Sequence, residues 1–162
     1  MNGPVNPNRR QVLAGGGALV VSFSLSDAFA QENAAAGAPK PPGSLATSPY
    51  LDAWIRIDAD GITAFTGKAE LGQGFKTAFQ QIAAEELDVP FKSLTVVTAD
   101  TRRTANEGYT SGSHSMQDSG TAIQYAAAQA RELLVAEAAT RLDLAAENLR
   151  TENGAVIAPD GR

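Results

Sequence analysis

The chain has 162 residues, of which 43% are hydrophobic and 19% are charged, a length and composition that suit one globular domain. Its formal net charge of -5 gives no reason to expect nucleic acid or an anionic membrane surface as a partner. It has no cysteine and one histidine, His114, so this chain alone cannot build a cysteine-ligated iron–sulfur cluster or an ordinary zinc site, and a redox metal would have to come with an organic ligand or belong to another subunit.

The first 30 residues have the order of an export signal. Arg9 and Arg10 precede a mildly apolar segment, residues 14–25, and Ala28-Phe29-Ala30 supplies the small residues that signal peptidases recognise. The paired arginines and the glycine-containing apolar segment favour the twin-arginine type. The alternative is a short anchoring helix, but the segment is short for a membrane span. We therefore predict a twin-arginine signal peptide at residues 1–30 and a periplasmic protein, exported folded, with any membrane association made through partners.

Residues 31–49 are rich in alanine, glycine, proline and serine and hold almost no large apolar side chain. Such a segment cannot bury enough surface to offset the entropy lost on ordering. Three prolines within it, at 39, 41 and 42, favour polyproline-like structure over helix. We predict an extended, flexible linker here, followed by one domain over residues 50–162.

Hydrophobic periodicity and turn residues divide this domain into short strands and helices. The predicted elements are, in order, strands 53–57 and 62–66, helix 75–87, strand 94–98, helix 119–140, a short helix 144–149, and a hairpin of 149–152 with 155–158. Alternation in the first strand places Trp54 and Arg56 on one face. The order β-β-α-β-α-α-β-β predicts an α+β fold, a mostly antiparallel sheet with helices packed on one face.

The segment 67–74, Gly-Lys-Ala-Glu-Leu-Gly-Gln-Gly, joins the second strand to the first long helix. Gly72 and Gly74 lack a Cβ, so a ligand can approach the backbone closely. The free N–H groups at the start of the helix favour an anion, and the Gln73 amide suits a polar ligand better than a cation. We predict one wall of a phosphate-rich cofactor site. The alternative is a tight structural turn, since short glycine patterns recur by chance.

A long polar segment, residues 100–118, follows the third strand. Loops of this length without regular structure are usually functional or disordered. Residues 111–115, Ser-Gly-Ser-His-Ser, precede a helix, and hydroxyl and N–H groups at a helix start hydrogen-bond phosphate or a pterin ring well. Simple capping of that helix by Ser115 or Asp118 is the alternative.

A Rossmann dinucleotide site is disfavoured by the context of the glycine loop. The loop follows a hairpin strand rather than the opening strand of a βαβ unit, and no suitable acidic residue ends a second parallel strand.

The two loops together resemble a known family. In order along the chain, the similar segments are GKAELGQG (67–74), QIAAEEL (81–87), EGYTSGS (107–113) and SMQDSG (115–120). They are similar to the molybdopterin-binding subunit of the xanthine dehydrogenase family, in the branch typified by the isoquinoline 1-oxidoreductase β-subunit, which also begins with a twin-arginine signal. The resemblance covers about residues 50–162 and implies that they form the N-terminal part of a larger molybdopterin-binding domain.

The resemblance implies a molybdenum–molybdopterin cytosine dinucleotide cofactor, whose metal is held by the pterin dithiolene rather than by the protein. Gln73 matches the glutamine that hydrogen-bonds the pterin near the metal, and the small residues at 112, 113 and 115 match the segment that contacts the pterin and its phosphate. The implied cofactor-binding residues are Gly72, Gln73, Gly74, Gly112, Ser113 and Ser115, with no metal ligand among them. His114 is expected to face solvent or flank the cofactor. Asp100 and Glu107 are expected either to line the substrate approach or to be ordinary solvated carboxylates.

The activity implied by the resemblance is hydroxylation of an aldehyde or N-heteroaromatic compound with oxygen from water. Electrons would leave through a small [2Fe-2S] subunit to a c-type cytochrome or another acceptor. The family's general-base glutamate would lie beyond Arg162, in the remainder of the catalytic subunit, so no catalytic residue is expected here and this part alone should be inactive. The alternative is an exported, non-catalytic domain that binds a ligand or a partner, as a gene remnant or truncated subunit.

Overall fold

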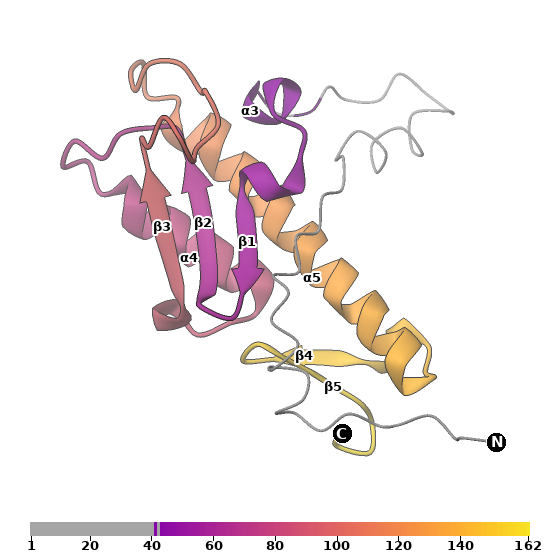
Figure 1. Ribbon diagram of the computed structural model, residues 1–162. Coiled ribbons are helices and arrows are strands. Elements are labelled where there is room, and N and C mark those ends of the chain that lie inside the picture. The colour runs from indigo at the N-terminus through magenta and orange to yellow at the C-terminus, as the bar shows by residue number, and fades with distance from the viewer. Residues whose placement is uncertain (1–40, 42) are drawn as a thin grey trace.

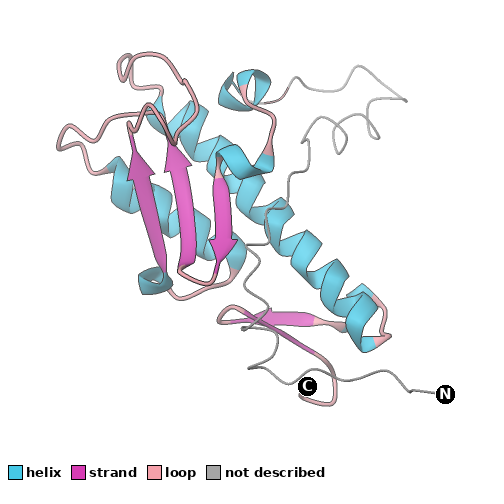
Figure 2. Ribbon diagram, in the orientation of Figure 1, coloured by secondary structure: helices cyan, strands magenta, loops and turns pink. Residues whose placement is uncertain are grey.

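The computed structural model describes residues 41 and 43–162, and in it two helices cover one face of a three-stranded sheet (Figure 1). Figure 2 shows the same layers by secondary structure, with a separate two-stranded hairpin at the C-terminal end. The elements are, in chain order, α3 (Gly43–Thr47), the 3-10 turn η1 (Leu51–Ala53), β1 (Ile55–Asp58), β2 (Gly61–Thr66), α4 (Phe75–Leu87), η2 (Phe91–Ser93), β3 (Leu94–Thr98), the π-helical turn η3 (Met116–Gly120), α5 (Thr121–Leu142), η4 (Ala146–Asn148), β4 (Arg150–Glu152) and β5 (Ala155–Ile157). The predicted export signal, and residues 31–40 and 42 of the predicted linker, lie outside the described residues.

The sheet has the order β1-β2-β3. β1 pairs with β2, and β4 with β5, in antiparallel register, whereas β2 and β3 are parallel. The predicted α+β class with helices on one face is confirmed. Parallel neighbours need a crossover connection, and α4 provides it, so β2, α4 and β3 form a βαβ unit. The argument that the glycine loop does not lie in such a unit was therefore wrong.

The core lies between the sheet and the two helices. Phe79 of α4 and Ile123 of α5 are fully buried, as is Leu94 of β3. Alanines on the buried stripe of α5 have little side-chain volume, so α4 can approach closely; they are Ala122, Ala126, Ala127 and Ala130. Each buried large side chain contributes about 1.5–3 kcal/mol, so this face fixes where α4, and the loop before it, begin.

Trp54 does not share a face with Arg56. It precedes β1 in a helical backbone conformation, with φ of -118° and ψ of -38°, so the strand alternation starts only after it. Its side chain is fully buried, and its indole N–H donates to the Ser48 carbonyl at 2.9 Å. Arg56 is exposed and lies over the ring of Phe65.

The N-terminal part of the domain starts earlier than predicted. Gly43–Thr47 is the short helix α3, not an extended linker. Leu45 is fully buried in the core and Ser44 is 6% exposed. The linker prediction was wrong for this segment because one leucine among small residues is enough to dock it.

The C-terminal elements follow the predictions closely. α5 begins at Thr121, after η3, and η4 replaces the predicted short helix. The hairpin turn at Asn153 and Gly154 has φ of 52° and 81°, as tight two-residue hairpin turns require. Within the described residues, no helix is both long enough and apolar enough to cross a membrane.

Candidate functional site

Both predicted loops leave the same edge of the sheet. Because β2 and β3 are parallel, they end side by side: Thr66 is paired with Thr98, and the Ala99 N–H donates to the Thr66 carbonyl at 2.9 Å. The glycine loop, residues 67–74, follows β2, and the long polar loop, residues 99–115, follows β3 (Figure 1). Ligands of open α/β sheets bind outside the carboxyl ends of the strands, so this edge is the candidate site.

The glycine loop exposes its backbone at two positions. Gly72 and Gly74 have φ of +98° and +80°, a conformation that side chains with a Cβ rarely adopt. A Cβ added at either glycine would meet no atom within 4 Å. The loop is therefore both a tight turn and a surface that a ligand can approach.

The N–H groups at the start of α4 are bonded by Glu70. One carboxylate oxygen accepts from the N–H groups of Gly72 at 2.8 Å and Gly74 at 3.0 Å, and the other accepts from Lys76 at 3.0 Å. The hydrogen bond from Lys76, and then that from Gly74, hold the pKa of the Glu70 carboxyl below its usual value. The prediction that these N–H groups are free to hold a phosphate was wrong, because a carboxylate of the same chain takes that place at the positive end of the helix.

Gln73 is exposed, and its carboxamide is oriented by two local bonds. The Leu71 N–H donates to Gln73 Oε1 at 2.6 Å, and Gln73 Nε2 donates to the Ala69 carbonyl at 3.0 Å. A carboxamide has two N–H donors and two oxygen lone pairs. One donor and one lone pair therefore remain for a ligand.

The second loop turns through two left-handed residues, Gly112 at φ 66° and Ser113 at φ 59°. A Cβ at Gly112 would lie 2.9 Å from His114 Cδ2, so the imidazole covers this glycine. His114 and Ser113 are exposed. Ser115 precedes η3 but makes no side-chain cap, which leaves its hydroxyl available and does not support the capping alternative for this residue.

Glu107 joins the two loops at their bases. The hydroxyls of Ser44 and Ser119 donate to Glu107 Oε1 at 2.7 and 2.5 Å. The Thr66 hydroxyl and the Gly67 N–H donate to Glu107 Oε2 at 2.6 and 2.7 Å. The half-buried carboxylate is therefore neither a solvated surface group nor free to line a substrate path, and both predictions for Glu107 were wrong.

Two further bonds tie the first loop to the second. The Lys68 ammonium group donates to the carbonyls of Glu107 and Tyr109 at 2.7 and 3.0 Å, and the Ala69 N–H donates to the Thr110 hydroxyl at 2.7 Å. Lys68 is only 4% exposed. A buried ammonium group is costly unless it is well bonded, so Lys68 commits the two loops to each other.

The structure thus brings the loop bases together, and leaves the predicted residues at the tips. Among the hydrogen bonds of the described residues, none joins Gln73 to Ser113 or Ser115. Asp100 does not reach the first loop either, and its carboxylate accepts from the Arg102 N–H at 3.0 Å in a local turn. The residues of the junction that the sequence analysis missed are Ser44, Thr66, Lys68, Thr110 and Ser119. A lysine directly after a buried strand was the one signal that could have indicated such a junction.

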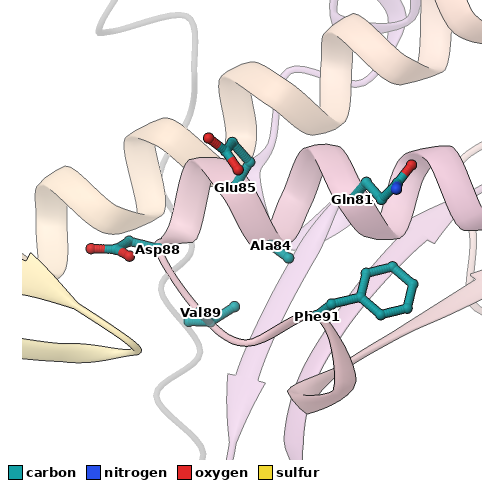
Figure 3. Close-up of a pocket in the computed structure, with 6 residues that line it drawn as sticks. All are labelled: Gln81, Ala84, Glu85, Asp88, Val89 and Phe91. Atoms are coloured by element: carbon teal, nitrogen blue, oxygen red, sulfur yellow. The ribbon is translucent and has the colours of Figure 1, made fainter.

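Two other observations on the described residues do not add to the site. A cavity of about 400 Å³ lies at the opposite end of α4, with the carboxylates of Glu85 and Asp88 and the ring of Phe91 around it (Figure 3). Neither loop lines it. Within residues 41 and 43–162, no group of three or more His, Asp or Glu side chains is placed to hold a metal ion.

Comparison with protein families gives a match to a domain described as "Molybdopterin cofactor-binding domain" over residues 8–162, which includes both loops. The matching nicotinate dehydrogenase polypeptide of Pseudomonas putida is 35% identical over 161 residues, covering 96% of this chain and 13% of the relative. The β-subunit of isoquinoline 1-oxidoreductase from Brevundimonas diminuta is 34% identical over 163 residues, covering 94% of this chain and 20% of the relative. The chain therefore spans a small part of the length of these relatives.

Solved structures have the same arrangement of elements. Quinoline 2-oxidoreductase from Pseudomonas putida 86 superimposes with a TM-score of 0.57 and 30% identity, over 64% of this chain and 13% of that chain. CO dehydrogenase from Oligotropha carboxidovorans superimposes with a TM-score of 0.59 and 26% identity, over 66% of this chain and 13% of that chain. In both, the matched region is one part of a much longer chain.

Proposed function

The chain belongs to the molybdopterin cofactor-binding domain family, and from that premise we propose that its two loops form part of the cofactor site of a molybdenum hydroxylase. The observation that carries the proposal is the junction of Glu107 and Lys68, which holds both loops of the family match at one edge of the sheet. A ligand that contacts two separate loops needs them at a fixed spacing, and this junction supplies it.

The residues present fit a pterin with a phosphate-bearing tail. The open backbone at Gly72 and Gly74 allows a flat ring to approach, and Gln73 has one N–H donor and one lone pair left for its edge. The exposed hydroxyl groups of Ser113 and Ser115 are donors for a phosphate. When bound, the cofactor would supply the redox metal; the residues of this chain would bind and orient it.

We infer the finer assignments from the relatives. Nicotinate, isoquinoline and quinoline appear in the names of three relatives, and all are N-heteroaromatic, so an N-heteroaromatic substrate is the first choice and an aldehyde the second. The cytosine dinucleotide form of the cofactor, oxygen from water, a small [2Fe-2S] subunit and a cytochrome acceptor are parts of the same proposal. So is a periplasmic location, which is supported by the twin arginines at 9 and 10.

The proposal is tested by measuring molybdenum and released pterin per chain in the protein purified from its native operon. We expect a stoichiometric molybdenum content in the wild type. Gln73→Ala should lower cofactor retention and activity and leave the fold intact, because the side chain is exposed and bonds only within its own loop. Gln81→Ala is the matched control, because Gln81 is an exposed glutamine of α4 that lies away from both loops.

The outcomes separate this function from the alternative. Loss of cofactor in Gln73→Ala and retention in Gln81→Ala would support the assignment. Equal retention in the two variants would remove Gln73 from the site. A wild-type protein that is folded and exported but contains no molybdenum would refute the enzyme assignment and support a non-catalytic binding domain instead.

A further inference from the structure

We propose that Glu107 is a positioning residue for the cofactor site: its carboxylate sets the spacing between the loop of residues 67–74 and the loop of residues 108–115. The inference rests on the proposed function. It goes beyond that function because Glu107 is placed to touch protein groups rather than the ligand.

The first argument is connectivity. Glu107 accepts hydrogen bonds from three separate segments: Ser44 in α3, Thr66 and Gly67 at the end of β2, and Ser119 in η3 before α5. These donors are far apart in sequence, so no local turn could bring them together. Removing the carboxylate would release the first loop, the second loop and the start of α5 from one another.

The second argument is burial. Thr66 and Ser119 are 0% exposed and Ser44 is 6% exposed, so water cannot easily replace the carboxylate as their partner. An ionised carboxylate only accepts hydrogen bonds and has about four lone-pair sites, and this one receives four donors. The fit is specific to a carboxylate because every group that faces it is a donor.

The third argument is position along the chain. Gly67 is the first residue of the glycine loop, and Glu107 directly precedes the loop that carries Gly112 and Ser113. The Gly67 N–H bonds the Glu107 carboxylate, and Lys68 bonds the main-chain carbonyl of Glu107, both at 2.7 Å. A shift at this junction would be carried to both loop tips, where the predicted ligand groups lie.

The chain offers a graded pair of substitutions. Glu107→Ala removes all four acceptor contacts. Glu107→Gln keeps one oxygen for Thr66 and Gly67, and its amide can donate to the hydroxyls of Ser44 and Ser119, which can turn to accept. A positioning role therefore predicts a large effect for alanine and substantial rescue by glutamine.

The test uses the assembled holoenzyme. Molybdenum and pterin per chain, and the rate of pterin release, are measured for the wild type, Glu107→Ala, Glu107→Gln and Leu134→Ala. Leu134 is a half-buried residue beside a second cavity near β4 and β5, so Leu134→Ala controls for lost stability away from the loops. Hydrogen exchange of the Gly67 and Ala69 amides reports whether the loops separate.

We expect Glu107→Ala to release pterin roughly tenfold faster, the usual scale for losing one hydrogen bond to a charged group. The Gly67 and Ala69 amides should exchange faster in the same variant. Glu107→Gln should lie close to the wild type, and Leu134→Ala should keep its cofactor despite a lower melting temperature.

Wild-type cofactor content and release rate in Glu107→Ala would overturn the inference and leave the proposed function standing. So would an equal loss in Glu107→Ala and Leu134→Ala, since a general loss of stability would then explain it. A wild type without molybdenum would overturn the proposed function and this inference with it.

Discussion

Gly67→Ala tests the loop junction by steric means. Gly67 is absent from the glycines with positive φ, so alanine suits its backbone conformation. The space does not allow it: a Cβ at this position would lie 2.1 Å from the Ala105 carbonyl oxygen and 3.2 Å from the Glu107 nitrogen. Ordinary contacts begin near 3.4 Å, so the second loop would have to move away by more than 1 Å.

Two costs follow from that movement. Overpacking against backbone costs about 1–3 kcal/mol. Lengthening the bond from the Gly67 N–H to the Glu107 carboxylate, now 2.7 Å, costs about 1.5–3 kcal/mol more, the range for hydrogen bonds to charged groups. We expect the free energy of unfolding to fall by about 3–5 kcal/mol.

The assay is urea unfolding followed by the fluorescence of Trp54, which is the chain's single tryptophan and is fully buried. Gly72→Ala is the control, because Gly72 has φ of +98° and open space around it, so only backbone strain of about 1 kcal/mol is expected. Without a clash, Gly67→Ala should instead stabilise the protein by about 0.4–1 kcal/mol through the unfolded state. A neutral or stabilising result would therefore refute the close approach of the two loops.

Two further predictions concern α4. For Glu70, whose pKa is lowered in the folded state, the bonds to Lys76 and Gly74 stabilise the fold above the unfolded-state pKa near 4.5 and cease to do so as the pH falls through the folded pKa. Urea midpoints of the wild type and Glu70→Gln should therefore differ at about pH 6 and converge at about pH 3, and a constant difference would contradict the cap. Phe79→Ala should lower the free energy of unfolding by about 3–5 kcal/mol, because Phe79 is fully buried with its ring centroid 4.7 Å from that of Phe75; a loss below about 1 kcal/mol in the same assay would contradict its place in the core.

Local patterns predicted the elements well because their causes are local. α4 runs from Phe75 to Leu87 as predicted, since apolar residues recur at helical spacing and Asp88 and Pro90 end it. β3 runs from Leu94 to Thr98 as predicted, because β-branched residues fill it. The direction in which β3 pairs with β2 was not predictable in this way, since side-chain alternation is the same in parallel and antiparallel strands.

The site was predicted where it depends on composition and missed where it depends on distant contacts. Gly72 and Gly74 were assigned an open backbone because glycine implies it. The roles of Glu107 and Ser44, which are 63 residues apart and joined by a hydrogen bond of 2.7 Å, could not be inferred from any spacing. Glu70 was a different case: a glutamate six residues before Lys76, at the start of a helix, is a typical partner for free N–H groups, and the glycines drew attention away from it.

The cap made by Glu70 changes what the glycine loop can do for a ligand. The N–H groups of Gly72, Gly74 and Lys76 are bonded within the chain, so a phosphate there would have to displace a carboxylate of the same chain. The Gln73 carboxamide and the open glycine backbone need no such exchange. The physical division that follows is that the first loop contacts the neutral part of a cofactor and the second loop, with its exposed hydroxyl groups, contacts the anionic part. Glu107 and Lys68 matter in this scheme because two loops with different tasks must be held at one spacing.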